Sequence, residues 1–334
     1  METNFIRLGF IGCGVIASAH LRNLKAIPEA RVVAFSDPNW SAAERLARAA
    51  DLEPGPQTVF PDWRQMLDMV PLNGVLVLSP HSYHAEQVIA CLEKGLAVLV
   101  EKPLAVSVDQ VQTIVRKKDE RGGIVVVSYQ RRYMPAFRFV REQIRSGAIG
   151  RLEVAYGIVG HGWKRATQGT WRQVPTVSGG GMLMDSGSHL VDIVLWTLPG
   201  RPAEVTATLS HLDSPVEIND IVTIRMDDGC LVSLVALGDL PYYKETYEFI
   251  GTDGTLKVDL TVSPPVTRYA SDGQPTAVPE QDMGPPSNPD RNLVDLILGK
   301  GQNESPPEEA LRVLAVTEAA YRAASDKSWV TLNQ

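Results

Sequence analysis

Continuous apolar runs alternate with amphipathic segments through the first 128 residues. Runs of this kind, without polar residues at every second position, are typical of parallel strands that helices cover on both faces. They predict strands at Phe5–Ile11, Arg31–Ser36, Gly74–Leu78, Ala97–Val100 and Ile124–Ser128, and a weaker one at Thr58–Phe60. The segments between them predict helices near Val15–Ala26, Ser41–Ala50, Trp63–Met69, Tyr83–Lys94 and Ser107–Arg121. We therefore expect a first domain over residues 1–128 with a doubly wound parallel α/β sheet.

The pattern changes after about residue 130. Helices are predicted near Ala136–Ser146, Gly181–Leu198, Pro289–Leu298 and Pro307–Ser325, and a proline-rich loop over residues 263–288. Strands are predicted at Leu152–Val159, Val205–His211, Ile218–Met226, Leu231–Leu237 and Thr246–Gly251, with a possible further strand at Thr255–Asp259. Successive strands without helices between them predict an α+β domain over residues 129–334 with an open, mostly antiparallel sheet. The C-terminal helix is a candidate to pack back on the first domain.

Composition narrows the class of protein. Hydrophobic residues make up 44% and charged residues 21% of the 334, and the formal net charge is −7. This charge argues against nucleic acid or an anionic membrane as the main partner. The three cysteines, Cys13, Cys91 and Cys230, have no disulfide or metal-ligand spacing, and no apolar run is long enough to span a membrane. We expect a cytoplasmic protein without a metal site.

A glycine turn follows the first predicted strand and opens a helix. Gly12 allows a tight turn, and Gly14 lets the backbone approach a pyrophosphate, which Val15 and Ile16 would also line at the helix N-terminus. A second strand ends at Asp37, whose carboxylate can bind adenosine ribose hydroxyls and repel a 2′-phosphate. The pattern predicts a dinucleotide site that prefers NAD, with NADP less favoured. The alternatives are an incidental glycine turn and an Asp37 that only caps the next helix.

Two further strand ends carry polar residues. Ser79-Pro80, followed by His84, comes after one strand, and Glu101-Lys102-Pro103 follows the next. Ligands bind outside the carboxyl edge of open parallel sheets, so these loops are expected to flank the cofactor. His84 can equally be a helix residue without a chemical task, and a single lysine is usually a solvated charge.

A glycine run at residues 179–181 precedes Asp185, His189 and Asp192. On a helix, Asp185 and His189 would share one face, and Asp192 could lie beside His189. A carboxylate that orients an imidazole suits a general base working near neutral pH. The alternative is a surface pair or a helix cap. Upstream, Trp163 and the pair Trp171-Arg172 offer aromatic surface and polar contacts, with core packing as the alternative for both tryptophans.

Together these motifs resemble the glucose–fructose oxidoreductase / inositol dehydrogenase / rhizopine-catabolism family, written Gfo/Idh/MocA. The resemblance runs nearly end to end. Besides the motifs above, it rests on Gly95, Arg132, Pro135, Gly187 and the Ser-Trp-Val at residues 328–330. The chain departs from the family where His81 and Gln130 stand at positions that are frequently asparagine.

The resemblance implies a Rossmann domain that binds NAD(P), followed by a sheet domain that binds substrate and forms a homodimer or homotetramer. It implies hydride transfer between nicotinamide and a secondary alcohol or ketone of a sugar, cyclitol or sugar derivative. Lys102, Asp185 and His189 would be catalytic. Ser79, Pro80, His84, Glu101, Lys102 and Gln130 would join the cofactor site, and Lys102, Arg132, Trp163, Trp171, Arg172, Asp185 and His189 the substrate site.

Oxidation of an alcohol needs a base for the hydroxyl proton. Our hypothesis assigns this role to His189, with Asp185 orienting it or binding a substrate hydroxyl, and Lys102 stabilising the developing alkoxide. Two other functions remain open. One is an NAD-dependent glycosidase that oxidises the sugar transiently, and the other is a non-catalytic sensor that binds dinucleotide.

Overall fold

The computed structural model describes residues 5–332, which form two compact units. The first unit runs to Ala105 and also contains Asp109–Ser128 and Ser287–Glu309. The second contains Val106–Val108, Tyr129–Pro286 and the chain from Ala310 onward. The chain therefore leaves the first unit and returns to it.

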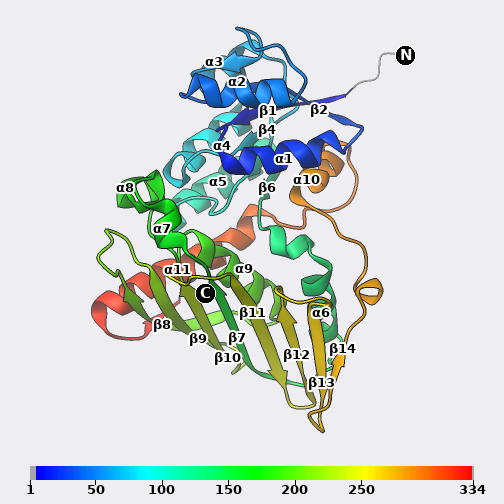
Figure 1. Cartoon of the computed structure of the whole chain (residues 1–334), viewed down its shortest axis with the longest axis vertical. Helices are drawn as coiled ribbons and strands as arrows, with labels where there is room; N and C mark the ends of the chain where they lie inside the picture. The colour runs from blue at the N-terminus through cyan, green and yellow to red at the C-terminus, as the bar shows by residue number, and fades with distance from the viewer. Residues whose placement is uncertain (1–4, 333–334) are drawn as a thin grey trace. The chain divides into compact units, whose positions relative to one another are not determined.

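The first unit is built on a six-stranded parallel sheet with the order β3-β2-β1-β4-β5-β6. Its strands are β1 (Ile6–Ile11), β2 (Ala30–Ser36), β3 (Val59–Phe60), β4 (Gly74–Val77), β5 (Ala97–Val100) and β6 (Val125–Val127). Its helices are α1 (Val15–Lys25), α2 (Trp40–Ala49), α3 (Trp63–Met69), α4 (His84–Glu93), α5 (Val108–Arg121) and α10 (Pro289–Ile297). The strand order reverses between β1 and β4, where dinucleotides bind in sheets of this kind. The expected Rossmann fold is confirmed (Figure 1).

Apolar strands build the core of this unit. Leu8, Phe10 and Phe35 are buried, and the two phenylalanine rings pack edge to face with centroids 5.2 Å apart. Leu293 and Val294 of α10 belong to the same buried cluster. A helix encoded after residue 286 therefore completes the core of the N-terminal unit.

The second unit is built on a nine-stranded sheet with the order β14-β13-β12-β11-β7-β10-β9-β8-β15. Its strands are β7 (Leu152–Gly160), β8 (Pro202–Ser210), β9 (Asn219–Met226), β10 (Leu231–Leu237), β11 (Lys244–Gly251), β12 (Gly254–Asp259), β13 (Val266–Ala270), β14 (Pro275–Ala277) and β15 (Val330–Thr331). Its helices are α6 (Pro135–Arg145), α7 (Trp163–Thr167), α8 (Pro175–Ser178), α9 (Ser186–Thr197) and α11 (Pro307–Asp326). Among the described strands, β7 and β10 pair in parallel and the other neighbours are antiparallel, as expected (Figure 1).

Burial alternates along the central strands of this sheet. On β9, Val222 and Ile224 are buried on the side against which α9 packs, whereas Ile221 and Arg225 are exposed. On β10, Leu231 is likewise exposed. An alternation of this kind shows that one face is covered while the other still carries apolar side chains at its surface.

Two predictions about local structure are wrong. Residues 263–288 are not one loop, because they contain β13 and β14 at the edge of the sheet. An edge strand tolerates Pro275 as its first residue, and the prolines obscured this pattern. The helix expected from Gly181 begins at Ser186, because residues 179–185 form a turn that glycine favours.

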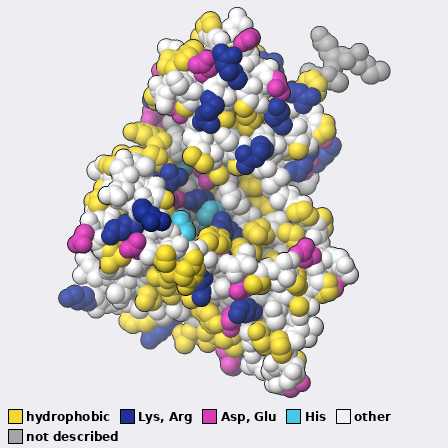
Figure 2. Space-filling model, viewed as in Figure 1, with side chains coloured by type: hydrophobic (Ala, Val, Ile, Leu, Met, Phe, Trp, Pro, Cys, Tyr) yellow, Lys and Arg dark blue, Asp and Glu magenta, His cyan; other side chains and the backbone are white. Residues whose placement is uncertain are grey.

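Among the described residues, no helix is long and apolar enough to cross a membrane. Basic and acidic side chains are interspersed over the visible face of the protein (Figure 2).

Candidate active site

The glycine turn of the first unit has the geometry of a phosphate-binding loop. Gly12 has φ +95°, and a Cβ atom there would lie 2.7 Å from the Leu78 carbonyl. Gly14 is the N-cap of α1, and apart from its neighbours in the chain no described atom lies within 4 Å of where its Cβ would be. Val15 is 94% exposed at the start of α1, and Ile16 follows it. The turn thus presents free space and a helix N-terminus, which suit a pyrophosphate.

Asp37 follows β2 and lies against this turn. Its Oδ2 accepts a hydrogen bond from the Cys13 N–H at 2.8 Å, and its Oδ1 accepts one from the Asn39 N–H at 2.8 Å. Arg45 donates to the Cys13 carbonyl at 3.1 Å. Each carboxylate oxygen keeps a second lone pair, so Asp37 is held in place and can still accept from ribose hydroxyls. The residues present therefore fit an NAD molecule.

His84 connects two loops of the first unit. Its ring nitrogens lie 2.8 Å from the carbonyl oxygens of Pro103 and Ser79, and the side chain is fully buried. Burial lowers the pKa of His84 and favours the neutral ring. The Ser79 hydroxyl donates to Gln87 at 2.6 Å, and Pro80 precedes a short 3-10 turn. His84 thus joins the loop after β4 to the loop after β5 through these two carbonyl groups.

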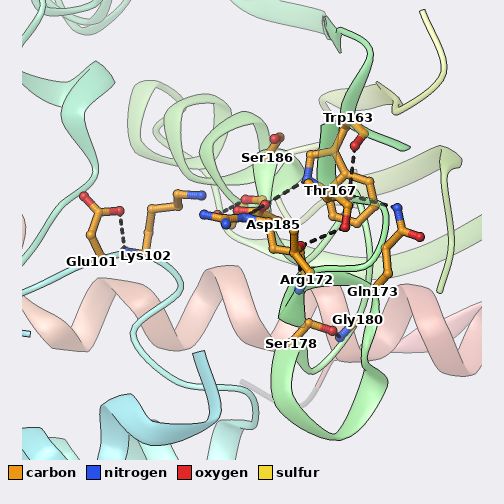
Figure 3. Close-up of polar contacts among 12 residues, drawn as sticks. Glu101, Lys102, Trp163, Thr167, Arg172, Gln173, Ser178, Gly180, Asp185 and Ser186 are labelled. Carbon is orange, nitrogen blue, oxygen red and sulfur yellow. Dashed lines mark hydrogen bonds and ion pairs between the residues drawn. The ribbon is translucent and has the colours of Figure 1, made fainter. Parts of the chain in front are cut away.

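Glu101 and Lys102 come directly after β5. The Glu101 carboxylate is buried, and its Oε2 accepts the Lys102 backbone N–H at 3.3 Å (Figure 3). Burial by itself would raise the pKa of Glu101, but the hydrogen bond and positive charge of His20 outweigh it and lower the pKa. Glu101 is therefore an internal anion that contacts the backbone of the candidate catalytic lysine.

In the second unit, the turn before α9 depends on close backbone approach. A Cβ on Gly181 would lie 2.0 Å from the Glu217 carbonyl oxygen, so only glycine fits. The Gly181 N–H donates to the Glu217 carboxylate at 2.7 Å, and the Tyr321 hydroxyl donates to the same oxygen at 2.8 Å. This buried contact fixes the turn that leads to Asp185.

Asp185 is the N-cap residue of α9 and is 5% exposed. Its Oδ2 accepts hydrogen bonds from Trp163 Nε1 at 2.8 Å and from Arg172 Nε at 2.9 Å (Figure 3). The Arg172 guanidinium also lies over the Trp171 ring, 4.5 Å from its centroid. Two donors on one oxygen hold Asp185 as a fixed carboxylate.

The two tryptophans differ in their surroundings. Trp163 is 2% exposed and uses its N–H on Asp185, so it acts as a buried support for that carboxylate. Trp171 is half-buried in a short 3-10 helix, where it keeps part of its surface accessible. Trp171 is thus the better candidate for stacking on a sugar.

His189 lies one helical turn after Asp185 on α9 and is 7% exposed. Its ring packs edge to face with that of Tyr129 at a centroid distance of 6.4 Å. Asp185 at the N-cap and His189 in the first turn of α9 are four residues apart, a spacing that favours the same side of the helix. The arrangement combines a fixed carboxylate with a packed imidazole.

Arg132 and Asp192 form a buried ion pair in this unit. Arg132 Nε lies 3.0 Å and 3.1 Å from the two Asp192 oxygens, and both side chains are nearly inaccessible. Asp192 thus has a fixed partner in Arg132. Gln130 and Arg132 share a 3-10 helix at Gln130–Tyr133. The pair ties this helix to α9, so Arg132 supports the site from within rather than from an open surface.

Sequence reasoning missed His20, which contacts both Glu101 and Asp290 in the first unit, and it missed Asp290. One signal was present: His20 falls among Ala17, Leu21 and Leu24 on the buried side of α1, where a polar residue needs a partner. The position of Asp290, 270 residues away, could not be inferred from spacing.

Fold and site together define a dinucleotide-binding oxidoreductase. Residues 6–129 match the family described as "Oxidoreductase family, NAD-binding Rossmann fold", and residues 137–257 match the "GFO/IDH/MocA C-terminal domain". The chain belongs to the Gfo/Idh/MocA family. The family model describes oxidoreductases with an NAD-binding Rossmann fold, so this chain is an NAD(P)-dependent oxidoreductase.

Curated relatives are similar over most of the chain. The scyllo-inositol 2-dehydrogenase (NAD(+)) of Bacillus subtilis is 28% identical over 262 residues, which cover 75% of this chain and 73% of the relative. The levoglucosan dehydrogenase of Pseudarthrobacter phenanthrenivorans is 27% identical over 289 residues, with coverages of 75% and 73%. Among solved structures, the WlbA dehydrogenase from Bordetella pertussis in complex with NADH and UDP-GlcNAcA superposes with a TM-score of 0.86. At 24% identity and 99% coverage of both chains, that structure supports the fold.

Proposed function

We propose that this chain transfers a hydride between NAD and a secondary alcohol or ketone of a sugar, a cyclitol or a sugar derivative. The observation that carries the proposal is the start of α9. There Asp185 is held by Trp163 and Arg172 one helical turn before His189. A fixed carboxylate beside an imidazole is suited to binding and deprotonating a hydroxyl group. The names of relatives, which include inositol and levoglucosan dehydrogenases, support the substrate class.

The chain's own groups divide the chemistry among them. When bound, the nicotinamide supplies the hydride acceptor for oxidation or the hydride donor for reduction. His189 takes the hydroxyl proton during oxidation and returns it during reduction. Asp185 orients the substrate through a hydroxyl group, and the Lys102 ammonium stabilises negative charge on the reacting oxygen. The proposal requires Lys102 and His189 to reach the same substrate.

The proposal places NAD on the glycine turn, with its pyrophosphate at Gly12, Gly14, Val15 and Ile16. Asp37 would accept hydrogen bonds from the adenosine ribose and disfavour a 2′-phosphate. The loops at Ser79-Pro80 and Glu101-Lys102, together with Gln130, would line the nicotinamide half. On the substrate side, Trp171 and Arg172 would contact the sugar, while Trp163 holds Asp185 and Arg132 ties its 3-10 helix to α9 through Asp192.

A substrate screen tests this function. Purified protein is mixed with NAD and a panel of inositols, hexoses, uronates and glycosides, and the absorbance of the reduced nicotinamide is followed. Sustained reduction with a polyol supports the proposal. Cofactor reduction that stops after the first turnover while a glycoside continues to be cleaved would instead establish the glycosidase. Binding of NAD without turnover of any polyol or ketone would favour the sensor.

We also propose that the protein forms a homodimer or homotetramer through the large sheet, over about residues 205–260. The support is the face opposite α9, where Ile221 is 51% and Leu231 50% exposed. A partner subunit would remove this apolar surface from water. Light scattering at micromolar protein should give a multiple of 36.5 kDa. Ile221→Lys should lower the mass, while the matched change Arg225→Lys on the same face should not. A wild-type monomer would contradict the proposal.

A further inference from the structure

A buried histidine of the first unit lies between two carboxylates. His20 Nδ1 is 2.7 Å from Asp290 Oδ1, and His20 Nε2 is 3.1 Å from Glu101 Oε1. His20 is 3% exposed, the Asp290 side chain is inaccessible, and the Glu101 side chain is 10% exposed. These three residues come from α1, from the turn after β5 and from α10. Because the contact is buried and its residues come from three segments, it is part of the interior of the fold and not a surface ion pair.

The geometry determines the charge of the ring. Ionised carboxylates only accept hydrogen bonds, so when both carboxylates are ionised both ring nitrogens of His20 donate and the ring carries two protons. Burial opposes the charged form, but the charges of Asp290 and Glu101 and their hydrogen bonds outweigh it and raise the pKa of His20 to about 10. His20 is therefore an imidazolium at neutral pH.

The other oxygen of Glu101 leads to Lys102. Glu101 Oε1 faces His20, and Glu101 Oε2 accepts the backbone N–H of Lys102 at 3.3 Å. The carboxylate thus lies between an internal cation and the backbone of the residue that the proposed function makes catalytic. If the imidazolium were absent, the buried Glu101 carboxylate would lose a hydrogen bond and a positive charge that lower its pKa, and it would take up a proton more easily.

We propose that His20 is a positioning residue for hydride transfer, which keeps Glu101 ionised and thereby fixes the backbone of Lys102. The inference rests on the proposed function, because Lys102 acts on the substrate oxygen there. Asp290 completes the arrangement by holding the second ring nitrogen. The same helix that presents its N-terminus to the cofactor thus also sets the conformation of the Glu-Lys turn.

The other charged and titratable neighbours leave this assignment unchanged. The Lys102 ammonium and the His20 ring both act on Glu101 and lower its pKa. His84 also faces Glu101, but its own pKa is lowered by burial, so it is the neutral neighbour. Asn23 donates to Asp290 Oδ2 at 2.7 Å, whereas His20 contacts Asp290 Oδ1. His20 is therefore the buried cation through which Glu101 and Asp290 are joined.

Two substitutions separate a positioning role from a structural one. His20→Gln removes the cation and keeps a polar side chain, and Glu101→Gln removes the carboxylate charge with little change in shape. Both should lower kcat at neutral pH by about 10- to 100-fold, the loss typical of a misplaced catalytic group. In His20→Gln the dissociation constant of NAD should stay within about threefold, since the glycine turn and Asp37 are unchanged.

The pH profile gives the decisive signature. In His20→Gln, Glu101 loses its cation and becomes protonated more easily, so kcat should recover as rising pH ionises it. Glu101→Gln has no carboxyl to ionise, so it should stay slow at every pH. The matched control is Asn23→Ala, which weakens the same α1–α10 contact without touching Glu101 and should keep kcat within about twofold of wild type.

The proposal is overturned if His20→Gln keeps wild-type kcat, or if it loses the same factor at every pH. A second measurement needs no substrate and does not depend on whether the His20→Gln protein folds. In wild-type protein with ¹⁵N-labelled histidine, both ring N–H signals of His20 should persist between about pH 6 and 9, as in a protected imidazolium. A neutral His20 ring would overturn the proposal even if the enzyme is active. An enzyme that turns over no polyol, yet shows these signals, would instead refute the proposed function.

Discussion

The candidate cofactor site of the first unit and the candidate catalytic site of the second unit are built differently. In the first unit, the surface offered to the cofactor consists mainly of backbone: the Gly12–Gly14 turn and the start of α1, with Asp37 as the chief side chain. In the second unit, the candidate catalytic group is a set of side chains that hold one another, with Asp185 bound by Trp163 and Arg172. Binding a cofactor that many enzymes share can rely on backbone donors, whereas proton transfer needs a particular side chain at a particular place. Substitutions in the first unit should therefore weaken NAD binding, whereas substitutions in the second unit should lower kcat.

The largest effect should follow His189→Ala. Loss of a positioned base should lower kcat by roughly 100- to 10,000-fold, while NAD affinity stays nearly unchanged. The wild-type rate of oxidation should also rise with pH as the imidazole loses its proton. Steady-state kinetics and calorimetric titration with NAD measure the two constants. More than about a tenth of wild-type turnover in the variant would remove His189 from the role of base.

Gly12→Ala should weaken NAD binding and destabilise the fold, in contrast to His189→Ala. The positive φ and the close Leu78 backbone force the turn to open, which should reduce the free energy of unfolding by about 1–3 kcal/mol and NAD affinity by more than about tenfold. Gly14→Ala is the matched control, because Gly14 has an ordinary φ of −72° and open space around its Cβ position. It should retain stability and lose only NAD affinity. Equal stability losses in both variants would show that strain at Gly12 is not the cause.

Asp37→Ser should change cofactor choice with little effect on the chemical step. Wild type should bind NAD(H) more tightly than NADP(H), and the variant should narrow the ratio by about tenfold, since a charged hydrogen bond is worth about 1.5–3 kcal/mol. Titration of both cofactors gives the ratio. Tighter binding of NADP by wild type would refute the assignment of Asp37 to the ribose.

The buried acids sharpen the comparison further. Glu101 has an internal cation, whereas in the second unit burial and the charge of Glu217 raise the pKa of Asp220 to about 8. The folded state therefore holds a proton that the unfolded chain releases near pH 4, so stability falls as pH rises from about 4 to 8. Asp220→Asn should remove up to about 1.4 kcal/mol per pH unit of this slope, measured by urea unfolding across that range. Parallel pH dependences for the two proteins would contradict the prediction.

The sequence predicted best those features whose contacting residues lie close together along the chain. The parallel strands of the first unit are continuous apolar runs, and the glycine turn is contiguous, so periodicity and motif predicted both. The edge strands β13 and β14 were missed because their side chains are mostly exposed and their prolines resemble a loop. At an edge, backbone pairing decides the structure, and that pairing leaves little trace in hydrophobicity.

The site shows the same division. Candidate residues such as Asp185 and His189 could be named from spacing, but their partners could not. The indole N–H of Trp163, the guanidinium of Arg172 and the pairing of Arg132 with Asp192 arise from tertiary contacts. The link from His20 to Asp290 spans 270 residues. Spacing along one helix limits the residues that can be neighbours to a few positions, whereas contacts across the fold depend on the topology.

The return of the chain to the first unit has a consequence for biosynthesis. A ribosome that has made residues 1–128 has made all six strands of the parallel sheet, but not α10. At that stage Leu293 and Val294 are missing from the core of the sheet. His20 contacts Glu101 but lacks its second partner, Asp290. Folding of the N-terminal unit therefore finishes only after most of the second unit has emerged. A truncated gene that stops after the sixth strand encodes an incomplete unit, whereas joining residues 287–309 to it by a short linker supplies the missing helix.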